Sequence, residues 1–95
     1  MNNTRDFVSE VKRKKEMRHE EIVKFRVIAE VADPDDQIAF YQLIEDIVEK
    51  ENAVKEKLTV FEQSGEVDRT DMANEIEKLE KLAEDAIEAA RERIN

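Results

Sequence analysis

One four-residue segment has the residue types and the spacing of a metal site. Glu16-Met17-Arg18-His19 matches the Glu-x-x-His spacing with which carboxylate-bridged di-iron bundles place two ligands on one helix face. Such centres need a second copy of the motif, and this chain has a single histidine. Neighbouring cations would also repel a metal ion, and His19 alone is a poor general base without an orienting partner. We therefore expect no metal, no cofactor and no catalytic residue here.

Positive charge is concentrated around this segment. The first 28 residues carry eight basic and five acidic side chains, although the whole chain has a net charge of −9. A basic helix end can bind phosphates, but no aromatic interleaving or DNA-binding motif accompanies this one. The patch could therefore bind nucleic acid, bind an acidic protein partner, or be neutralised by carboxylates of the same molecule or of its oligomer. We favour neutralisation. The basic patch consists of Lys12, Arg13, Lys14, Lys15 and Arg18, and the neutralising carboxylates expected from an antiparallel helix are Glu49, Glu51 and Glu56.

Carboxylates recur at helical spacing in the last third of the chain. Pairs such as Glu77 with Glu80, and Glu80 with Glu84, have the chemistry to bind a divalent cation or to mimic a nucleic-acid backbone. In acidic helices such pairs more often form a solvated face, which we expect here, with Glu77 and Lys81 as an ordinary i, i+4 pair. Gly-rich phosphate loops, nucleophile elbows and zinc-finger spacings are absent from the sequence, which also has no cysteine. The sequence therefore predicts a protein that is not an enzyme.

The only proline and the only glycine divide the chain into three segments. Asp33 can cap a helix that has Pro34 at its first position, and Pro34 disfavours helical geometry at Asp33. Gly65 is placed to end the next helix in a left-handed cap, and Val67 and Met72 fit the two ends of a hydrophobic staple. These signals predict helices at about 4–32, 34–63 and 69–93 within a single helical domain, 1–95.

Each expected helix carries an apolar seam at spacings of three and four residues. Short connections make successive helices antiparallel. The sequence therefore predicts an all-α, elongated, antiparallel up-down-up three-helix bundle with coiled-coil-like packing. The three seams are Val8, Val11, Ile22, Phe25, Ala29 and Ala32; Phe40, Ile44, Ile47, Val54, Leu58 and Phe61; and Met72, Ile76, Leu79, Ala83, Ala86 and Ala90.

Charged residues interrupt the first two seams. Lys15 and Arg18 occupy positions where apolar residues belong, and so does Glu51. If the first two helices fold back at residues 32–34, equal levels have residue numbers that sum to about 66, which pairs Lys15 with Glu51 and Arg18 with Val48. We call Lys15, Arg18 and Glu51 the register layer, because a slipped pairing would leave a charge without a partner. A role of the two cations in binding a ligand or partner is the alternative.

A second apolar stripe on the first helix indicates an interface. At 100° per residue, Val23, Val27 and Val31 lie away from the main seam and are divided from it by Arg26 and Glu30. We call these three residues the valine stripe. An aligned apolar stripe on one helix more often belongs to an interface than to a surface that stays in solvent. We therefore expect the stripe to mediate self-association, with a dimer favoured, or docking to another protein.

Composition excludes several classes of function. With 43% charged residues and a net charge of −9, the chain is a poor candidate for plain nucleic-acid binding, and it contains no apolar run long enough to span a bilayer. The absence of cysteine suits a reducing cytoplasm. We expect a cytoplasmic, oligomeric, non-enzymatic helical protein–protein interaction module: an adaptor, inhibitor or small subunit. The alternative is a nucleic-acid-associated protein that uses the segment from Lys12 to Arg18.

Overall fold

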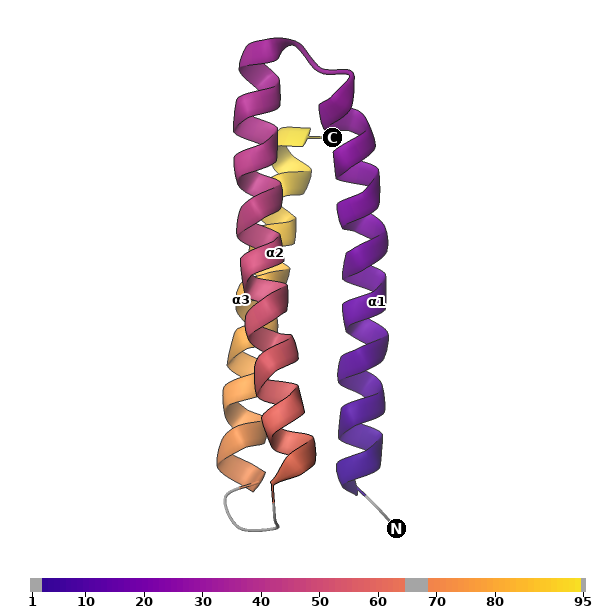
Figure 1. The fold of residues 1–95 in the computed structure, drawn as a ribbon, viewed down its shortest axis with the longest axis vertical. Helices are drawn as coiled ribbons and strands as arrows, with labels where there is room; N and C mark the ends of the chain where they lie inside the picture. The colour runs from indigo at the N-terminus through magenta and orange to yellow at the C-terminus, as the bar shows by residue number, and fades with distance from the viewer. Residues whose placement is uncertain (1–2, 65–68, 95) are drawn as a thin grey trace.

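Three long helices form the described part of the chain. The computed structural model describes residues 3–64 and 69–94, which fold as α1 (Asn3–Glu30), α2 (Pro34–Gln63) and α3 (Arg69–Ile94). They run up, down and up in an elongated bundle with extents of 50 × 19 × 18 Å (Figure 1). The predicted all-α, antiparallel three-helix bundle is confirmed. In these described residues, no helix combines the length and the apolar character that a bilayer crossing requires.

The break between α1 and α2 is set by Pro34. α1 ends at Glu30, two residues before the predicted end, because the amides of Val31 and Ala32 bond to carbonyls only three residues earlier (3.2 and 3.3 Å). Asp33 is extended, as a residue before proline tends to be, and occupies the N-cap position of α2. Its side chain makes no capping hydrogen bond, so the predicted side-chain cap is wrong. Pro34 has already removed one of the free N–H groups, and the exposed Asp33 carboxylate stays hydrated.

α2 ends in a hydrogen-bonded turn at Ser64. The Ser64 amide donates to the carbonyl of Val60 (3.0 Å), and the Ser64 hydroxyl donates to the carbonyl of Phe61 (2.9 Å). These bonds satisfy carbonyls at the end of the helix that have no amide partner within it. The predicted glycine cap at Gly65 and the start of the staple at Val67 lie outside the described residues.

The buried apolar side chains form two separate clusters rather than one continuous core. The turn-end cluster lies near the α1–α2 turn, and the far-end cluster lies at the opposite end of the bundle. The turn-end cluster consists of Ile22, Phe25, Ala29, Ile44, Ile47, Ala86, Ile87, Ala90 and Ile94, and the far-end cluster of Val11, Val54, Leu58, Phe61 and Ile76. Charged side chains occupy the level between them, as described below.

α1 is the least closely packed of the three helices. α2 and α3 pack against each other most extensively, whereas α1 makes fewer contacts with either. In Figure 1, α2 and α3 run close together and α1 runs along one side of that pair. The α2–α3 pair is therefore the more firmly held part of the molecule, and α1 shares less of its surface with the core.

The buried side of α3 gives a direct measure of core packing. Ile87 is fully buried in the turn-end cluster, whereas Leu82 on the same helix is 47% exposed. Ile87→Ala should lower the free energy of unfolding by about 2–4 kcal/mol through lost burial and a residual cavity, and Leu82→Ala by no more than about 0.5 kcal/mol. Urea unfolding followed by circular dichroism measures both. Equal losses would show that α3 does not pack in this orientation.

Candidate functional site

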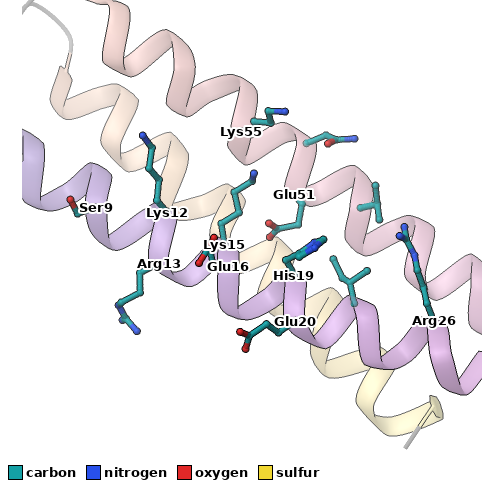
Figure 2. Close-up of a pocket in the computed structure, with 13 residues that line it drawn as sticks. Ser9, Lys12, Arg13, Lys15, Glu16, His19, Glu20, Arg26, Glu51 and Lys55 are labelled. Carbon is teal, nitrogen blue, oxygen red and sulfur yellow. The ribbon is translucent and has the colours of Figure 1, made fainter.

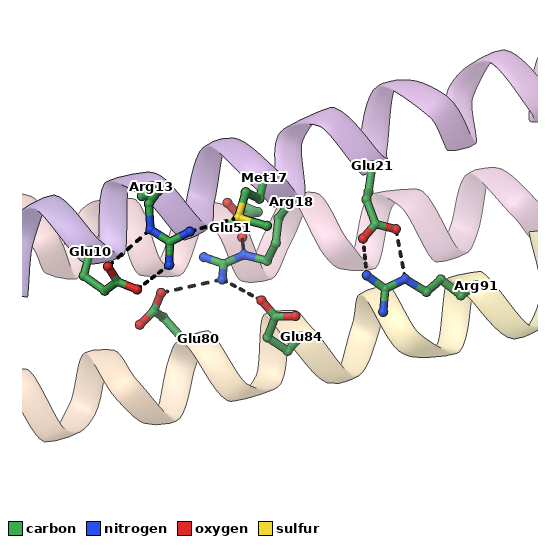
Figure 3. A network of polar contacts seen from close by, with 9 residues as sticks. All are labelled: Glu10, Arg13, Met17, Arg18, Glu21, Glu51, Glu80, Glu84 and Arg91. Carbon is green, nitrogen blue, oxygen red and sulfur yellow. Dashed lines mark hydrogen bonds and ion pairs between the residues drawn. The ribbon is translucent and has the colours of Figure 1, made fainter.

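A buried arginine links all three helices. Arg18 of α1 is only 3% exposed and lies between α2 and α3 (Figure 3). Its Nε donates to Oε1 of Glu51 on α2. Its Nη1 lies 3.0 Å from Oε1 of Glu84 and 3.5 Å from Oε2 of Glu80, both on α3. One guanidinium therefore holds carboxylates from two helices at the level that separates the two apolar clusters.

The charges in this polar cluster do not balance. Glu51 and Glu80 are both buried, Glu84 is half-exposed, and Arg18 is the cation that all three share. Nη2 of Arg18 and Oε2 of Glu80 have no hydrogen-bond partner. Buried polar atoms without partners cost free energy. The cluster therefore fixes how the helices meet more than it adds to net stability.

Burial and hydrogen bonding act in opposite directions on these groups. Burial lowers the pKa of Arg18, but the hydrogen bonds that it donates to Glu51 and Glu84, with the charges of the nearby carboxylates, outweigh that effect and raise the pKa, so the guanidinium stays charged. For Glu80, burial dominates and raises the pKa, with the charges of Arg18 and Lys14 opposing it. Burial therefore disfavours the ionised form of Glu80.

The structure brings part of the predicted register layer together and adds residues that the sequence analysis missed. Glu51 is in contact with Arg18, so the predicted pairing of Glu51 with Lys15 is wrong. Lys15 is half-buried one turn away and lies on a groove wall with Glu51, but it has no ion pair among the described residues. The expectation of a solvated acidic face is wrong for Glu80, which faces the core because it follows Ile76 by one helical turn on the buried side of α3.

An open groove runs between α1 and α2 at the level of the polar cluster. Figure 2 shows Lys15 and Arg26 reaching from α1 toward α2, where Lys55 lies on the other wall. We call it the α1/α2 groove. Its lining residues are Ser9, Lys12, Arg13, Lys15, Glu16, His19, Glu20, Ile22, Arg26, Val48, Glu51, Asn52 and Lys55.

The predicted basic patch does not form one surface. Arg18 is buried, and Arg13 points away from α2 and pairs with Glu10 (Figures 2 and 3). Lys14 lines a different groove, between α1 and α3. Lys12 lies 3.6 Å from Glu62 of α2. A helix directs consecutive side chains about 100° apart, so a run of adjacent cations spreads around its circumference.

Neutralisation of the patch also differs from the prediction. Of the three carboxylates expected to provide it, Glu51 binds Arg18, while Glu49 and Glu56 are exposed and have no ion pair with a described residue. Glu10 and Glu62 take that role instead, for Arg13 and Lys12. Within residues 3–64 and 69–94, Lys15 and Lys55 have no ion-pair partner.

The valine stripe is exposed in the isolated chain. Val23 is 47%, Val27 59% and Val31 83% exposed, and Val31 lies in the turn beyond the end of α1. Val23 and Val27 continue, at steps of three and four, the row in which Glu16 and Glu20 line the α1/α2 groove. The stripe is therefore the extension of one edge of that groove toward the turn.

Two exposed apolar residues of α2 lie at the level of the stripe. The side-chain amide of Gln37 donates to the carbonyl of Glu30 (3.0 Å), which fixes the level of the two helices near the turn. Tyr41 follows Gln37 by one helical turn and is 40% exposed, so it lies on the α1 side of α2 at about the level of Val27. Ile38, which is 63% exposed, lies three residues before Tyr41 on the same helix. We call the valine stripe together with these two residues the apolar shoulder.

The Glu-x-x-His segment shows no geometry of a metal site. Glu16 and His19 are both exposed on the wall of the α1/α2 groove. In the described part of the chain, no group of three or more His, Cys, Asp or Glu side chains is arranged to hold a metal ion.

Comparisons with known proteins give no family for this fold and groove. No protein-family model matches the chain, and neither the curated proteins nor the solved structures give a significant match to it. A function for this protein must therefore be inferred from the side chains described above.

The polar cluster predicts a strong asymmetry between single and combined substitutions. Arg18→Leu should cost about 3–5 kcal/mol of stability, because it leaves Glu51 and Glu80 buried without their cation. Replacing Arg18, Glu51 and Glu80 together with leucine should recover most of that loss or exceed the wild type, and Glu51→Leu alone should have a modest effect in either direction. Urea unfolding of the variants measures these differences. A triple variant as unstable as Arg18→Leu would contradict the account.

The pKa of Glu80 predicts a pH-dependent gain from its neutral isostere. Because burial raises this pKa in the folded state, the contribution of Glu80 to stability is full in acid and is lost as the pH rises through the folded value. Glu80→Gln should therefore be more stable than the wild type at pH 7, and the gain should vanish below about pH 4, where both side chains are neutral. Unfolding curves across this range test the trend. Glu77→Gln, exposed on the same helix, is the control and should change stability little.

Proposed function

We propose that this protein is a non-enzymatic helical interaction module that binds other protein surfaces along the α1/α2 face. The observation that carries the proposal is the apolar shoulder, whose five residues are all exposed and lie toward the turn end of the bundle, on α1, the turn after it and the start of α2. Grouped exposed apolar residues mark interaction sites more often than scattered ones do. The looser packing of α1 supports the proposal, because more of the surface of this helix remains uncovered by the rest of the bundle and can contact a partner.

Self-association is the simplest form of this function and the one that the sequence predicts. In an antiparallel two-fold dimer centred on Val27, the valine stripes of two copies would pack against each other, with Val23 of one copy opposite Val31 of the other. Such a contact would cover most of the apolar shoulder. A cytoplasmic location belongs to the same proposal, since a chain without cysteine suits a reducing compartment.

Nucleic-acid association has weaker support from the geometry. Arg18 is buried, the other cations of the basic patch point in different directions, and the chain as a whole is strongly acidic. Phosphate binding of this kind needs cations gathered on one surface. An adaptor, inhibitor or small-subunit role is the better account.

The assembly state of Val27→Glu tests the proposed self-association. The wild type should elute as a particle of about twice its 11.1 kDa mass at about 100 µM, and Val27→Glu should shift it toward the monomer by placing a charge in the valine stripe. Size-exclusion chromatography with light scattering measures the mass. Leu82→Glu on α3, where the wild-type side chain is similarly exposed, is the matched control and should leave the mass unchanged. A monomeric wild type at this concentration would rule out the dimer.

A further inference from the structure

Three cations that line the α1/α2 groove have no ion-pair partner among the described residues: Lys15 and Arg26 on α1, and Lys55 on α2. Of these, Lys15 and Lys55 lie on opposite walls at one level. The contact between Arg18 and Glu51 fixes the relative level of the two helices. Lys15 precedes Arg18 by three residues and Lys55 follows Glu51 by four, so in antiparallel helices the two lysines lie within about 2 Å of the same level. Both line the groove, and neither has an ion-pair partner among the described residues. Glu51 lines the same groove but is bound to Arg18, so the repulsion between the two lysines would be relieved by a further anion placed between them.

The cations of the α1/α2 groove and the valine stripe follow one another along α1. Moving along α1 toward the turn, the groove is lined by Lys12 and Lys15, then His19, then Ile22 and Arg26. Val23 and Val27 are exposed beside its turn end, on the extension of its outer edge. From Lys12 to Val27, this surface extends for about 15 residues, or roughly 23 Å of helix. An occupant that satisfies all of it is elongated, anionic opposite Lys15 and Lys55, and apolar toward the valine stripe, with a hydrogen-bond acceptor for Arg26.

We infer that the α1/α2 groove binds an amphipathic helix of another protein that is acidic opposite Lys15 and Lys55 and apolar opposite Val23 and Val27. The inference rests on the proposed function and names the partner's chemistry. A seated helix would place carboxylates between the two lysines and large apolar side chains on the apolar shoulder, which completes a four-helix arrangement. Glu16 and Glu20 on the outer edge of the groove select a basic residue on the flank of the same helix.

A second copy of this chain fits the whole groove less well. A two-fold dimer pairs the same surface of both copies. When it is centred on Val27, the partner's turn is reached about six residues away, or roughly 9 Å on either side. That contact covers the apolar shoulder and leaves Lys15 and Lys55 without an anion. Charge complementarity therefore favours a different, acidic chain over a second copy.

The binding of a designed helical peptide tests the inference. The probe is a fluorescein-labelled peptide of about 20 residues, long enough to span the groove, with Glu in one half and Leu in the other on a single face and Ala and Gln elsewhere. Fluorescence anisotropy with the full 95-residue chain should show saturable binding that weakens as salt rises. A peptide with Lys in place of Glu, and a shuffled peptide without a single face, should not bind.

Paired variants of the protein locate the binding site. Lys15→Glu/Lys55→Glu should weaken binding of the acidic peptide by at least about tenfold, as expected when charge pairing across an interface is reversed. Lys78→Glu/Lys81→Glu changes the net charge equally on α3 and should stay within about twofold of wild type. Circular dichroism checks the fold of each variant. Lys15→Gln/Lys55→Gln, which adds no negative charge near Glu51, repeats the test if the glutamate variant unfolds.

Each outcome decides between occupants. Failure of the acidic peptide to bind at about 100 µM, equal binding of the lysine peptide, or equal losses in both double variants overturns the inference. Tighter binding of a single-stranded oligonucleotide than of the peptide, lost in Lys15→Glu/Lys55→Glu, would make the occupant a nucleic acid and also overturn it. A stable dimer that Val27→Glu dissociates, together with no peptide binding, would overturn the inference while leaving the proposed interaction function intact. A monomer that binds no peptide would remove both.

Discussion

The burial of one guanidinium among three carboxylates constrains the rest of this bundle. Apolar seams of similar residues at similar spacing can slide past one another by a turn with little loss of buried area. Arg18 removes that freedom, because a slip by one turn separates it from Glu51 and leaves charges from two helices buried without partners. The cluster that fixes this single register also contains an Arg18 Nη2 without a hydrogen-bond partner and a Glu80 carboxylate whose pKa is raised.

The same contact explains how α1 stays attached although it packs less closely than the other helices. On either side of Arg18, α1 contributes a few large side chains to the clusters, such as Phe25 at the turn end and Val11 at the far end. Closer to the turn, Arg91 of α3 binds Glu21 through two nitrogens and lowers the pKa of that carboxylate (Figure 3). Polar contacts at fixed points thus hold a helix whose outer side remains open. An interaction module of the proposed kind needs that combination of fixed orientation and free surface.

The sequence predicts the elements of this fold better than it predicts which charges meet. Pro34 and the three seams place the helices, because a missing N–H and an apolar period act locally and survive in the tertiary structure. The charge of Glu80 predicts an exposed side chain, but its position predicts a buried one, because it continues the 4-3-4 spacing of Ile76, Ala83 and Ile87, which are all buried. In the structure, helical position rather than charge decides the burial of Glu80.

The difference between Lys15 and Arg18 as the partner of Glu51 lies beyond what residue arithmetic resolves. Both cations lie near the buried face, one turn apart, and an antiparallel register drawn from a turn of uncertain length cannot separate them. The outcome matters for the surface. Had Lys15 taken Glu51, the wall of the α1/α2 groove would be neutral at that level. Because the more buried Arg18 binds it, Lys15 stays unpaired in a chain with a net charge of −9. The free cation on the α1 wall of the groove is therefore a direct consequence of the buried arginine that sets the register.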